Sequence, residues 1–260
     1  MTKDKKILIL DIDGTLVNSR KEITPLTLSY LHEIQEKGHI VALASGRPYP
    51  GMKGYAEQLG LDKMGGYAVS FNGARIISCR DGSAVYEKTM PNHYLKDIYN
   101  YATEHGIGMV TYKDDMVVTG TRIDDYMEYE ARLNYMPLKH IDNFCEEVDF
   151  DMVKCLLTAE PEYAAQCEKE LYDMLSPELN VFRSEPYFIE ITMQGVDKAE
   201  SIDHLLKILD IPRENSICCG DGFNDLTMVK YAGIGVAMEN AQQIVKDNAD
   251  YITASCDDDG

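Results

Sequence analysis

The chain has 260 residues, of which 45% are hydrophobic and 27% charged. This composition is ordinary for a globular protein, and the length allows one large core or two smaller ones. Lys and Arg number 25 against 44 Asp and Glu, which gives a formal net charge of −19. A field of this sign repels polyanions, so nucleic acids and anionic membranes are excluded as expected partners, although local cations could still hold a small phosphate.

The cysteines and the N-terminal residues bear on location. The seven cysteines are scattered, with neither metal-type spacing nor a paired framework, so we expect reduced thiols. The first apolar stretch ends at Asp11, too soon for a signal peptide or a membrane span. These features predict a cytoplasmic protein that does not associate with membranes.

The first third of the chain predicts alternating strands and helices. A strand over 6–10 is followed by a helix that Thr24 caps, with Pro25 in its first turn and Gly38 at its end. A strand over 39–44 and a helix ending near Gly60 come next. This β-α-β-α order is typical of a parallel sheet covered by helices.

The middle of the chain changes pattern. Short strands flank turns at Asn72–Gly73 and Asp81–Gly82, which predicts antiparallel hairpins. From Pro91 the pattern mixes helices and strands without the earlier alternation. We therefore expect an inserted α+β cap domain at residues 82–185, with a role in substrate specificity.

The last part resumes the α/β rhythm. Helices are expected over 197–209, 226–232 and 241–248, and strands over 216–219, 234–238 and 251–253. Residues 1–81 and 186–260 would then form one core. The predicted fold class is α/β, with a Rossmann-like parallel sheet and the inserted α+β cap domain.

Polar residues follow three of the predicted core strands. Asp11 and Asp13 follow the first strand in DIDGT, Ser45 follows the second in SGR, and Asp221 and Asp225 lie in GDGFND. Loops at the carboxyl ends of parallel strands gather at one edge of the sheet. Two carboxylates held together repel each other, so ionising both requires a cation or a shared proton. Their oxygens are the ligands that Mg²⁺ prefers, although each loop alone could equally be a turn or a helix cap.

Two further features could bind an anion. Ser45 and Gly46 could hold a phosphate through a hydroxyl and an amide at the start of a helix. Lys198 begins a predicted helix, where the macrodipole disfavours a cation. A phosphate facing Lys198 would remove this conflict, whereas a solvated lysine is the simpler interpretation of the residue alone.

Together these motifs resemble those of a known superfamily. DIDGT, Ser45 of ASGR, Lys198 and GDGFND occur in the order typical of the haloacid dehalogenase superfamily, and SFNGA at 70–74 resembles a signature of its Cof-type phosphatases. These have a large class IIB cap between the second and third motifs. The third motif reads GVDKAES, with Asp197 and Ala199 where relatives commonly carry a small polar residue and Gly.

The resemblance implies a role for each motif. Asp11 would be the nucleophile that forms an aspartyl phosphate, and Asp13 would protonate the leaving alcohol and then deprotonate the attacking water. The metal ligands would be Asp11, the carbonyl of Asp13 and Asp221, with Asp225 orienting the site. The expected residues for binding phosphate and substrate are Ile12, Ser45, Gly46, Arg47, Lys198 and Asn224.

The function predicted from these roles is an Mg²⁺-dependent phosphatase of a small phosphorylated metabolite, with sugar phosphates as the favoured class. A phosphomutase, which returns the phosphoryl group to its substrate, and a non-catalytic sensor of phosphorylated metabolites are alternatives. A sensor would have no need of Asp13. The cap residues that could contact a leaving group, each also interpretable as a surface or packing residue, are Tyr112, Asp114, Asp115, Arg122, Arg132 and Arg183.

Overall fold

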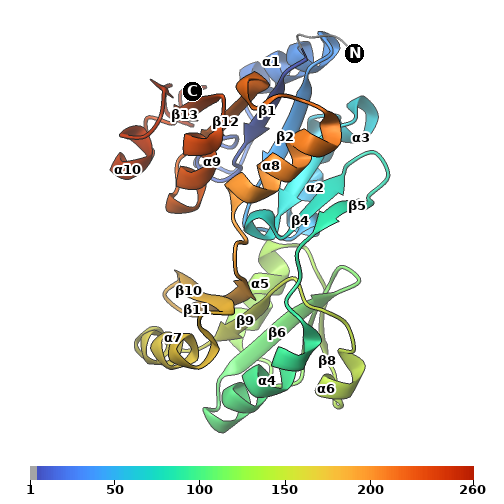
Figure 1. The fold of residues 1–260 in the computed structure, drawn as a ribbon, viewed down its shortest axis with the longest axis vertical. Coiled ribbons are helices and arrows are strands. Elements are labelled where there is room, and N and C mark those ends of the chain that lie inside the picture. Colours follow the sequence, from blue (N-terminus) through green and yellow to red (C-terminus); the bar gives the residue numbers. More distant parts are fainter. Residues whose placement is uncertain (1–4) are drawn as a thin grey trace. The chain divides into compact units, whose positions relative to one another are not determined.

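The computed structural model describes residues 5–260 and divides into two compact units (Figure 1). The core unit comprises the chain up to Glu87 and from Asp197 onward, and the cap unit comprises Lys88–Val196. The chain therefore leaves the core unit once and returns to it once, as expected for an inserted domain.

The core unit is built on an eight-stranded sheet in the order β14-β13-β12-β1-β2-β3-β4-β5. The strands are β1 (Ile7–Leu10), β2 (Ile40–Ala44), β3 (Tyr67–Ser70), β4 (Arg75–Ser78), β5 (Ala84–Glu87), β12 (Ser216–Gly220), β13 (Ile234–Ala237) and β14 (Tyr251–Ile252). Pairing is parallel from β14 to β3 and antiparallel for β3 with β4 and β4 with β5. The predicted parallel sheet and the predicted hairpins are both confirmed.

Helices cover both faces of this sheet. They are α1 (Pro25–Glu36), α2 (Tyr49–Gln58), α3 (Leu61–Met64), α8 (Lys198–Leu209), α9 (Leu226–Tyr231) and α10 (Gln243–Lys246). Successive strand residues point to opposite faces, so Ile7 and Ile9 pack in one cluster with Leu205 of α8, whereas Leu10 packs in another with Leu31 of α1. Burial of these apolar side chains holds the helices on the sheet.

The cap unit has its own sheet and its own core. Its strands are β6 (Gly108–Lys113), β7 (Met116–Thr119), β8 (Leu138–His140), β9 (Cys155–Thr158), β10 (Leu179–Glu185) and β11 (Phe188–Met193), in the order β10-β11-β9-β6-β7-β8. Its helices are α4 (Leu95–Glu104), α5 (Asp125–Leu133), α6 (Phe144–Glu147) and α7 (Pro161–Leu175). One apolar cluster, which includes Ile98, Leu157 and Leu171, lies entirely within this unit. The α+β character expected of the cap is confirmed.

The unit boundaries differ from the expected insertion at residues 82–185. Strand β5 belongs to the core unit because it pairs with β4, with Tyr86 opposite Ile76. Strand β11 belongs to the cap unit because it pairs with β10 and β9, with Ile191 opposite Cys155. Strand β5 lies inside the expected insertion and β11 lies after its end, so both boundaries of the cap unit are later in the sequence than expected.

The order of the central strands brings the motifs together. Strands β12, β1 and β2 are neighbours and parallel, so their carboxyl ends at Gly220, Leu10 and Ala44 lie at one edge of the sheet. Helix α8, which begins with Lys198, packs on the same sheet. Within residues 5–260, no helix has both the length and the apolar character needed to cross a membrane.

Candidate active site

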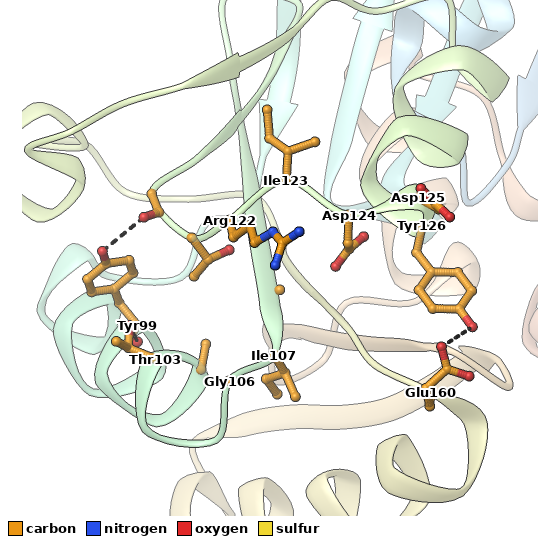
Figure 2. Close-up of a pocket in the computed structure, with 14 residues that line it drawn as sticks. Tyr99, Thr103, Gly106, Ile107, Arg122, Ile123, Asp124, Asp125, Tyr126 and Glu160 are labelled. Carbon is orange, nitrogen blue, oxygen red and sulfur yellow. Dashed lines mark hydrogen bonds between the residues drawn. The ribbon is translucent and has the colours of Figure 1, made fainter.

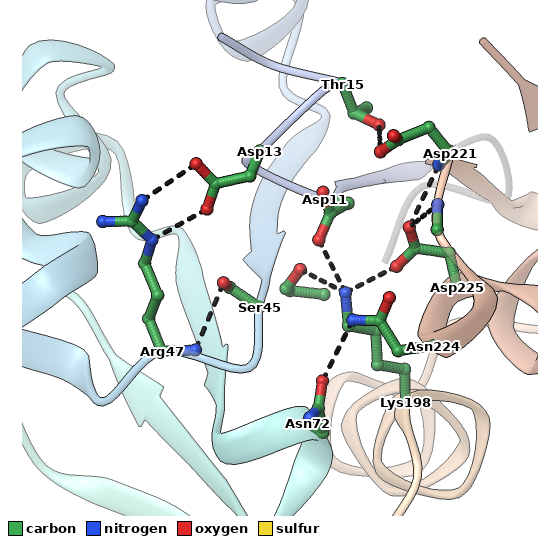
Figure 3. A network of polar contacts seen from close by, with 12 residues as sticks. Asp11, Asp13, Thr15, Ser45, Arg47, Asn72, Lys198, Asp221, Asn224 and Asp225 are labelled. Atoms are coloured by element: carbon green, nitrogen blue, oxygen red, sulfur yellow. Dashed lines mark hydrogen bonds and ion pairs between the residues drawn. The ribbon is translucent and has the colours of Figure 1, made fainter. Parts of the chain in front are cut away.

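Three carboxylates meet at the ends of β1 and β12. Asp11, Asp221 and Asp225 each present an oxygen, and these oxygens all lie within 4.8 Å of one another. Asp11 is 6% exposed and Asp225 is 1% exposed, whereas Asp221 is partly buried. Figure 3 shows Asp11 and Asp225 at the end of Lys198, and Asp221 beside Thr15. Such a set of oxygen ligands suits a hard divalent cation.

The ammonium of Lys198 lies among these carboxylates and is fully buried. Its Nζ donates to Oδ1 of Asp11 at 2.7 Å, to the carbonyl of Ala44 at 2.9 Å and to Oδ1 of Asp225 at 2.5 Å. These bonds use all three of its N–H donors. Burial alone would lower the pKa of Lys198, but the two carboxylates raise it further than burial lowers it. In the structure, therefore, carboxylates offset the unfavourable position of this lysine at a helix start.

The residues around Lys198 fix the start of α8. Asp197 is the N-cap, and its carboxylate accepts a hydrogen bond from the backbone N–H of Glu200 at 2.9 Å. Gly73 approaches this cap so closely that a Cβ there would overlap the carbonyl of Asp197. The Asp that departs from the common third motif thus acts as a helix cap beside the buried lysine.

The loops after β1 and β12 also lock together. Thr15 donates its hydroxyl to Oδ1 of Asp221 at 3.1 Å, and Oδ2 of Asp225 accepts the backbone N–H groups of Asp221 and Gly222. Gly14 has φ +86°, and a Cβ there would lie 2.5 Å from Oδ2 of Asp221. The glycine of DIDGT therefore provides both the turn and the space that Asp221 occupies.

The charges of this cluster are unbalanced. Lys198 supplies one positive charge for three carboxylates, so full ionisation would leave a charge of −2. Burial and the charge of Asp225 raise the pKa of Asp221 to about 6. Burial also raises the pKa of Asp11, although Lys198 opposes this effect. A divalent cation would offset this charge and use the same oxygens, so the donor set fits such an ion.

Asp13 points away from this cluster, toward Arg47 (Figure 3). Its Oδ2 accepts from Nε of Arg47 at 2.8 Å, and its Oδ1 accepts from Nη2 of Arg47 at 2.8 Å and from Nζ of Lys21 at 2.7 Å. Partial burial would raise the pKa of Asp13, but hydrogen bonds from the two cations hold it below its usual value. The side chain of Ile12 is buried, so only its main chain could contact a phosphate.

The loop after β2 lies next to Asn72 of the SFNGA segment. The hydroxyl of Ser45 accepts the backbone N–H of Arg47 at 3.3 Å, and the carbonyl of Ser45 accepts that of Asn72 at 3.0 Å. Asn224 donates its amide to Oδ1 of Asn72 at 3.1 Å, and a Cβ on Gly46 would lie 3.1 Å from Nδ2 of Asn72. Asn72 thus joins two of the predicted phosphate loops.

Two residues contact the site but are not among the predicted site residues, namely Asn72 and Lys21. Asn72 lies in a segment that resembles a family signature and has φ +54°, which an Asn-Gly pair favours. Lys21 lies in a loop without a motif, and its position depends on the folding of that loop back onto Asp13. The sequence therefore contained a signal for Asn72 and none for Lys21.

The cap residues singled out in the sequence have varied environments. Tyr112 is buried and donates its hydroxyl to Oε1 of Glu130 at 2.6 Å, and Arg183 pairs with Glu168 at 2.8 Å. Arg122 lines a cavity of about 830 Å³ in the cap unit, where Figure 2 shows its guanidinium pointing into the space. The lining residues all fall within residues 99–160, so the cavity contains none of the motif residues.

Comparison with known proteins identifies the family. The family model described as haloacid dehalogenase-like hydrolase matches residues 8–260. A putative phosphatase of Bacillus subtilis, YxeH, is 30% identical over 98% of this chain and 95% of its own length. The crystal structure of a haloacid dehalogenase-like hydrolase from Bacteroides thetaiotaomicron is 41% identical, covers 98% of this chain and 96% of that one, and superposes with a TM-score of 0.93.

A third relative has a more specific description. The structure of BT4131, described as a sugar phosphatase of haloacid dehalogenase subclass IIB, is 25% identical and has a TM-score of 0.79, covering 98% of this chain and 96% of that one. The resemblance to the haloacid dehalogenase superfamily and to its Cof-type phosphatases is thereby confirmed. On the strength of the match over residues 8–260, the chain belongs to the haloacid dehalogenase-like hydrolases.

Proposed function

We propose that this protein is an Mg²⁺-dependent phosphatase that hydrolyses a small phosphorylated metabolite through an aspartyl phosphate on Asp11. The observation that carries the proposal is the position of Asp11, which lies within one cluster with Asp221, Asp225 and Lys198. Phosphoryl transfer depends mainly on positioning and on neutralisation of charge, and these residues can supply both.

The proposed metal ligands are Asp11, the carbonyl of Asp13 and Asp221. Asp225 would orient the site, because its Oδ2 accepts two backbone N–H groups and its Oδ1 accepts from Lys198. A bound Mg²⁺ would offset the carboxylate charge and polarise a phosphoryl oxygen. The side chain of Asp13 points away from the three carboxylates and toward Arg47. This orientation is compatible with a role of its main-chain carbonyl as a metal ligand.

In the first half of the proposed reaction, a carboxylate oxygen of Asp11 forms a bond to phosphorus. The bond from phosphorus to the leaving oxygen breaks, and its electron pair stays on that oxygen. The same oxygen takes a proton from Asp13. In the second half, a water molecule attacks phosphorus and gives a proton to Asp13. The bond between phosphorus and Asp11 then breaks, which releases phosphate and regenerates both carboxyl groups.

The side chains around Asp11 would hold the phosphoryl group during both steps. Ser45, Gly46 and Asn224 are the proposed donors to its oxygens, together with the main chain of Ile12. Lys198 would reach it by exchanging one of its three present acceptors.

Asp13 must carry a proton in the first half, whereas Arg47 and Lys21 favour its ionised form. A phosphate dianion that binds beside these cations adds negative charge and shifts the balance toward protonated Asp13. Substrate binding would thus favour the protonated Asp13 that the first step requires. Arg47 could then bind either Asp13 or the phosphate.

For the substrate class we propose sugar phosphates. Support comes from the description of BT4131 as a sugar phosphatase and from its similarity to this chain over nearly the full length of both. The net charge of −19 disfavours polynucleotides.

The experiment compares wild type with Asp11→Asn on a panel of sugar phosphates and other phosphate monoesters, with Mg²⁺ or EDTA. Wild type should release inorganic phosphate only with Mg²⁺, and Asp11→Asn should lose at least about 10⁴-fold of that rate. Asp210→Asn, at an exposed position beyond α8, is the matched control and should keep full activity. Unchanged phosphate release by folded Asp11→Asn would refute the mechanism, and a requirement for a phosphorylated activator would indicate a phosphomutase.

A further inference from the structure

The loop after β1 returns Lys21 to Asp13. Asn18 is buried, and its Oδ1 accepts the backbone N–H groups of Arg20 at 3.0 Å and Glu22 at 3.1 Å. The backbone N–H of Asn18 donates to the carbonyl of Glu22, and that of Lys21 donates to the carbonyl of Asn18. Lys21 takes a left-handed conformation with φ +62° at the tip of this closed loop. The loop geometry therefore fixes the backbone from which Lys21 reaches Asp13.

Asp13 is held from two separate segments. Arg47, in the loop after β2, donates to both of its carboxylate oxygens, and Lys21 adds a third bond to Oδ1. The side chain of Asp13 is 35% exposed, so packing alone does not immobilise it. A bidentate contact orients the carboxylate relative to one guanidinium, and a second donor from another segment also limits rotation of the whole side chain.

We infer that Lys21 is a positioning residue, which holds the carboxyl group of Asp13 where it can exchange a proton with the leaving group. The inference rests on the proposed function, since it concerns the acid of that reaction. It goes beyond the motifs because Lys21 belongs to none of them. Lys21 acts through Asp13 and does not itself contact the reacting atoms.

Position and charge make opposite predictions for the loss of Lys21. A poorly oriented Asp13 transfers its proton more slowly, which slows the release of a basic alcohol. Removal of a cation, in contrast, favours the protonated form of Asp13 and would speed the same step. Whether the loss of Lys21 slows or speeds the reaction of a substrate with a poor leaving group therefore separates positioning of Asp13 from an effect of charge alone.

The test measures kcat/KM, which reports the steps up to phosphoryl transfer, for two substrates with Mg²⁺. One is p-nitrophenyl phosphate, whose leaving group needs little protonation, and the other is the sugar phosphate that wild type hydrolyses best. The variants are Lys21→Met, Lys21→Arg and the neighbouring Arg20→Met. Arg20 pairs with Glu22 instead of Asp13, so its variant is a matched control.

Lys21→Met should lower kcat/KM on the sugar phosphate about tenfold more than on p-nitrophenyl phosphate. The ratio of kcat/KM on the sugar phosphate to kcat/KM on p-nitrophenyl phosphate should therefore fall in Lys21→Met, return most of the way to the wild-type value in Lys21→Arg, and stay at the wild-type value in Arg20→Met. If Lys21→Met leaves this ratio unchanged, because both substrates lose equally, or raises it, the inference is overturned. Wild type that hydrolyses neither substrate would instead refute the proposed function, and melting curves with Mg²⁺ would show whether each variant is folded.

Discussion

At the scale of residues, the buried ammonium of Lys198 is the central feature of the site. It bonds Asp11 and Asp225 and so connects the ends of β1 and β12 from the first turn of α8. A buried charge is tolerable only when it is paired and hydrogen-bonded, and these two carboxylates meet that condition. Any loss of the lysine leaves at least two buried carboxylates without their counter-charge.

Lys198→Met should lower the free energy of unfolding by about 3–5 kcal/mol, because it leaves buried charges unpaired. Urea denaturation in EDTA measures this loss. Lys207→Met is the control on the same helix, since Lys207 forms an exposed pair with Asp203 and should contribute about 1 kcal/mol or less. Equal effects of the two variants would show that the buried network does not stabilise the fold.

The raised pKa values predict a pH-dependent response to Mg²⁺. Without metal, Asp221 has a pKa of about 6 and that of Asp11 is also raised, so the folded chain binds these protons more tightly than the unfolded chain does. The stability that these groups contribute is present at acid pH and is lost as pH rises through the folded pKa values. Mg²⁺ binds the ionised forms and should reverse that loss.

The melting temperature with Mg²⁺ minus that with EDTA should therefore increase between about pH 5 and about pH 7.5. Thermal melts at a series of pH values measure this difference. Asp221→Asn should remove most of it, because it deletes a proposed ligand. A shift that stays constant with pH in wild type, or survives in Asp221→Asn, would contradict the assignment.

Motif residues were predictable where chemistry and spacing coincided. Asp11, Asp221 and Asp225 were expected to meet because loops at the carboxyl ends of parallel strands gather at one edge of a sheet, and the structure brings their oxygens together. The contacts of Lys198 were not predictable in the same way, since a phosphate was expected where the carboxylates of Asp11 and Asp225 lie. Lys21 was missed because its contact depends on how a single loop closes.

At the scale of elements, two loops interlock through a glycine. The turn at Gly14 carries the chain past Asp221, and the carboxylate of Asp221 occupies the space where a side chain would begin. Thr15, the next residue, donates to the same carboxylate. The short motif DIDGT thus specifies both the conformation of its own loop and the position of a side chain more than 200 residues away.

Gly14→Ala should displace Asp221 and so weaken the binding of Mg²⁺. The loss in Mg²⁺ binding should be larger than the loss in stability measured without metal. Its Cβ would lie 2.5 Å from Oδ2 of Asp221. Gly38→Ala is the control, because Gly38 has a similar φ of +89° and a Cβ there would meet no atom of the described residues within 4 Å. Both variants carry backbone strain of about 1 kcal/mol, which melting in EDTA measures. Equal Mg²⁺ titrations for the two would disprove the steric argument.

Element prediction succeeded where local signals were strong. Thr24 caps α1 as expected, accepting from the backbone N–H of Thr27 at 3.2 Å, with Pro25 in the first turn. The elements that were not predicted are short and are held by tertiary contacts. Strand β8 reads Leu-Lys-His and gains its hydrogen bonds by pairing with β7, and helices α3 and α6 have only four residues each. Such segments have too few residues to show a periodicity.

At the scale of the whole molecule, the chain builds two cores from three segments. The apolar cluster of the cap unit draws only on residues 90–193, and the clusters of the core unit draw on residues outside that range. The change from alternating strands and helices to an α+β pattern predicted the insertion. Its boundaries were less accessible, because β5 and β11 pair with the adjacent strands β4 and β10, and the pattern of such a hairpin does not show which of the two sheets it joins.

The central claim is that a phosphoryl group passes through Asp11, and rapid acid quench of the Asp13→Asn variant with p-nitrophenyl phosphate and Mg²⁺ tests it most directly. This substrate needs little acid catalysis to transfer its phosphoryl group, whereas the second step lacks its base and should be slow. We expect a burst of about one p-nitrophenolate per chain, with a phosphoryl group on the peptide that contains Asp11. Steady release of p-nitrophenolate without a burst, and without a phosphoryl group on that peptide, would contradict the account.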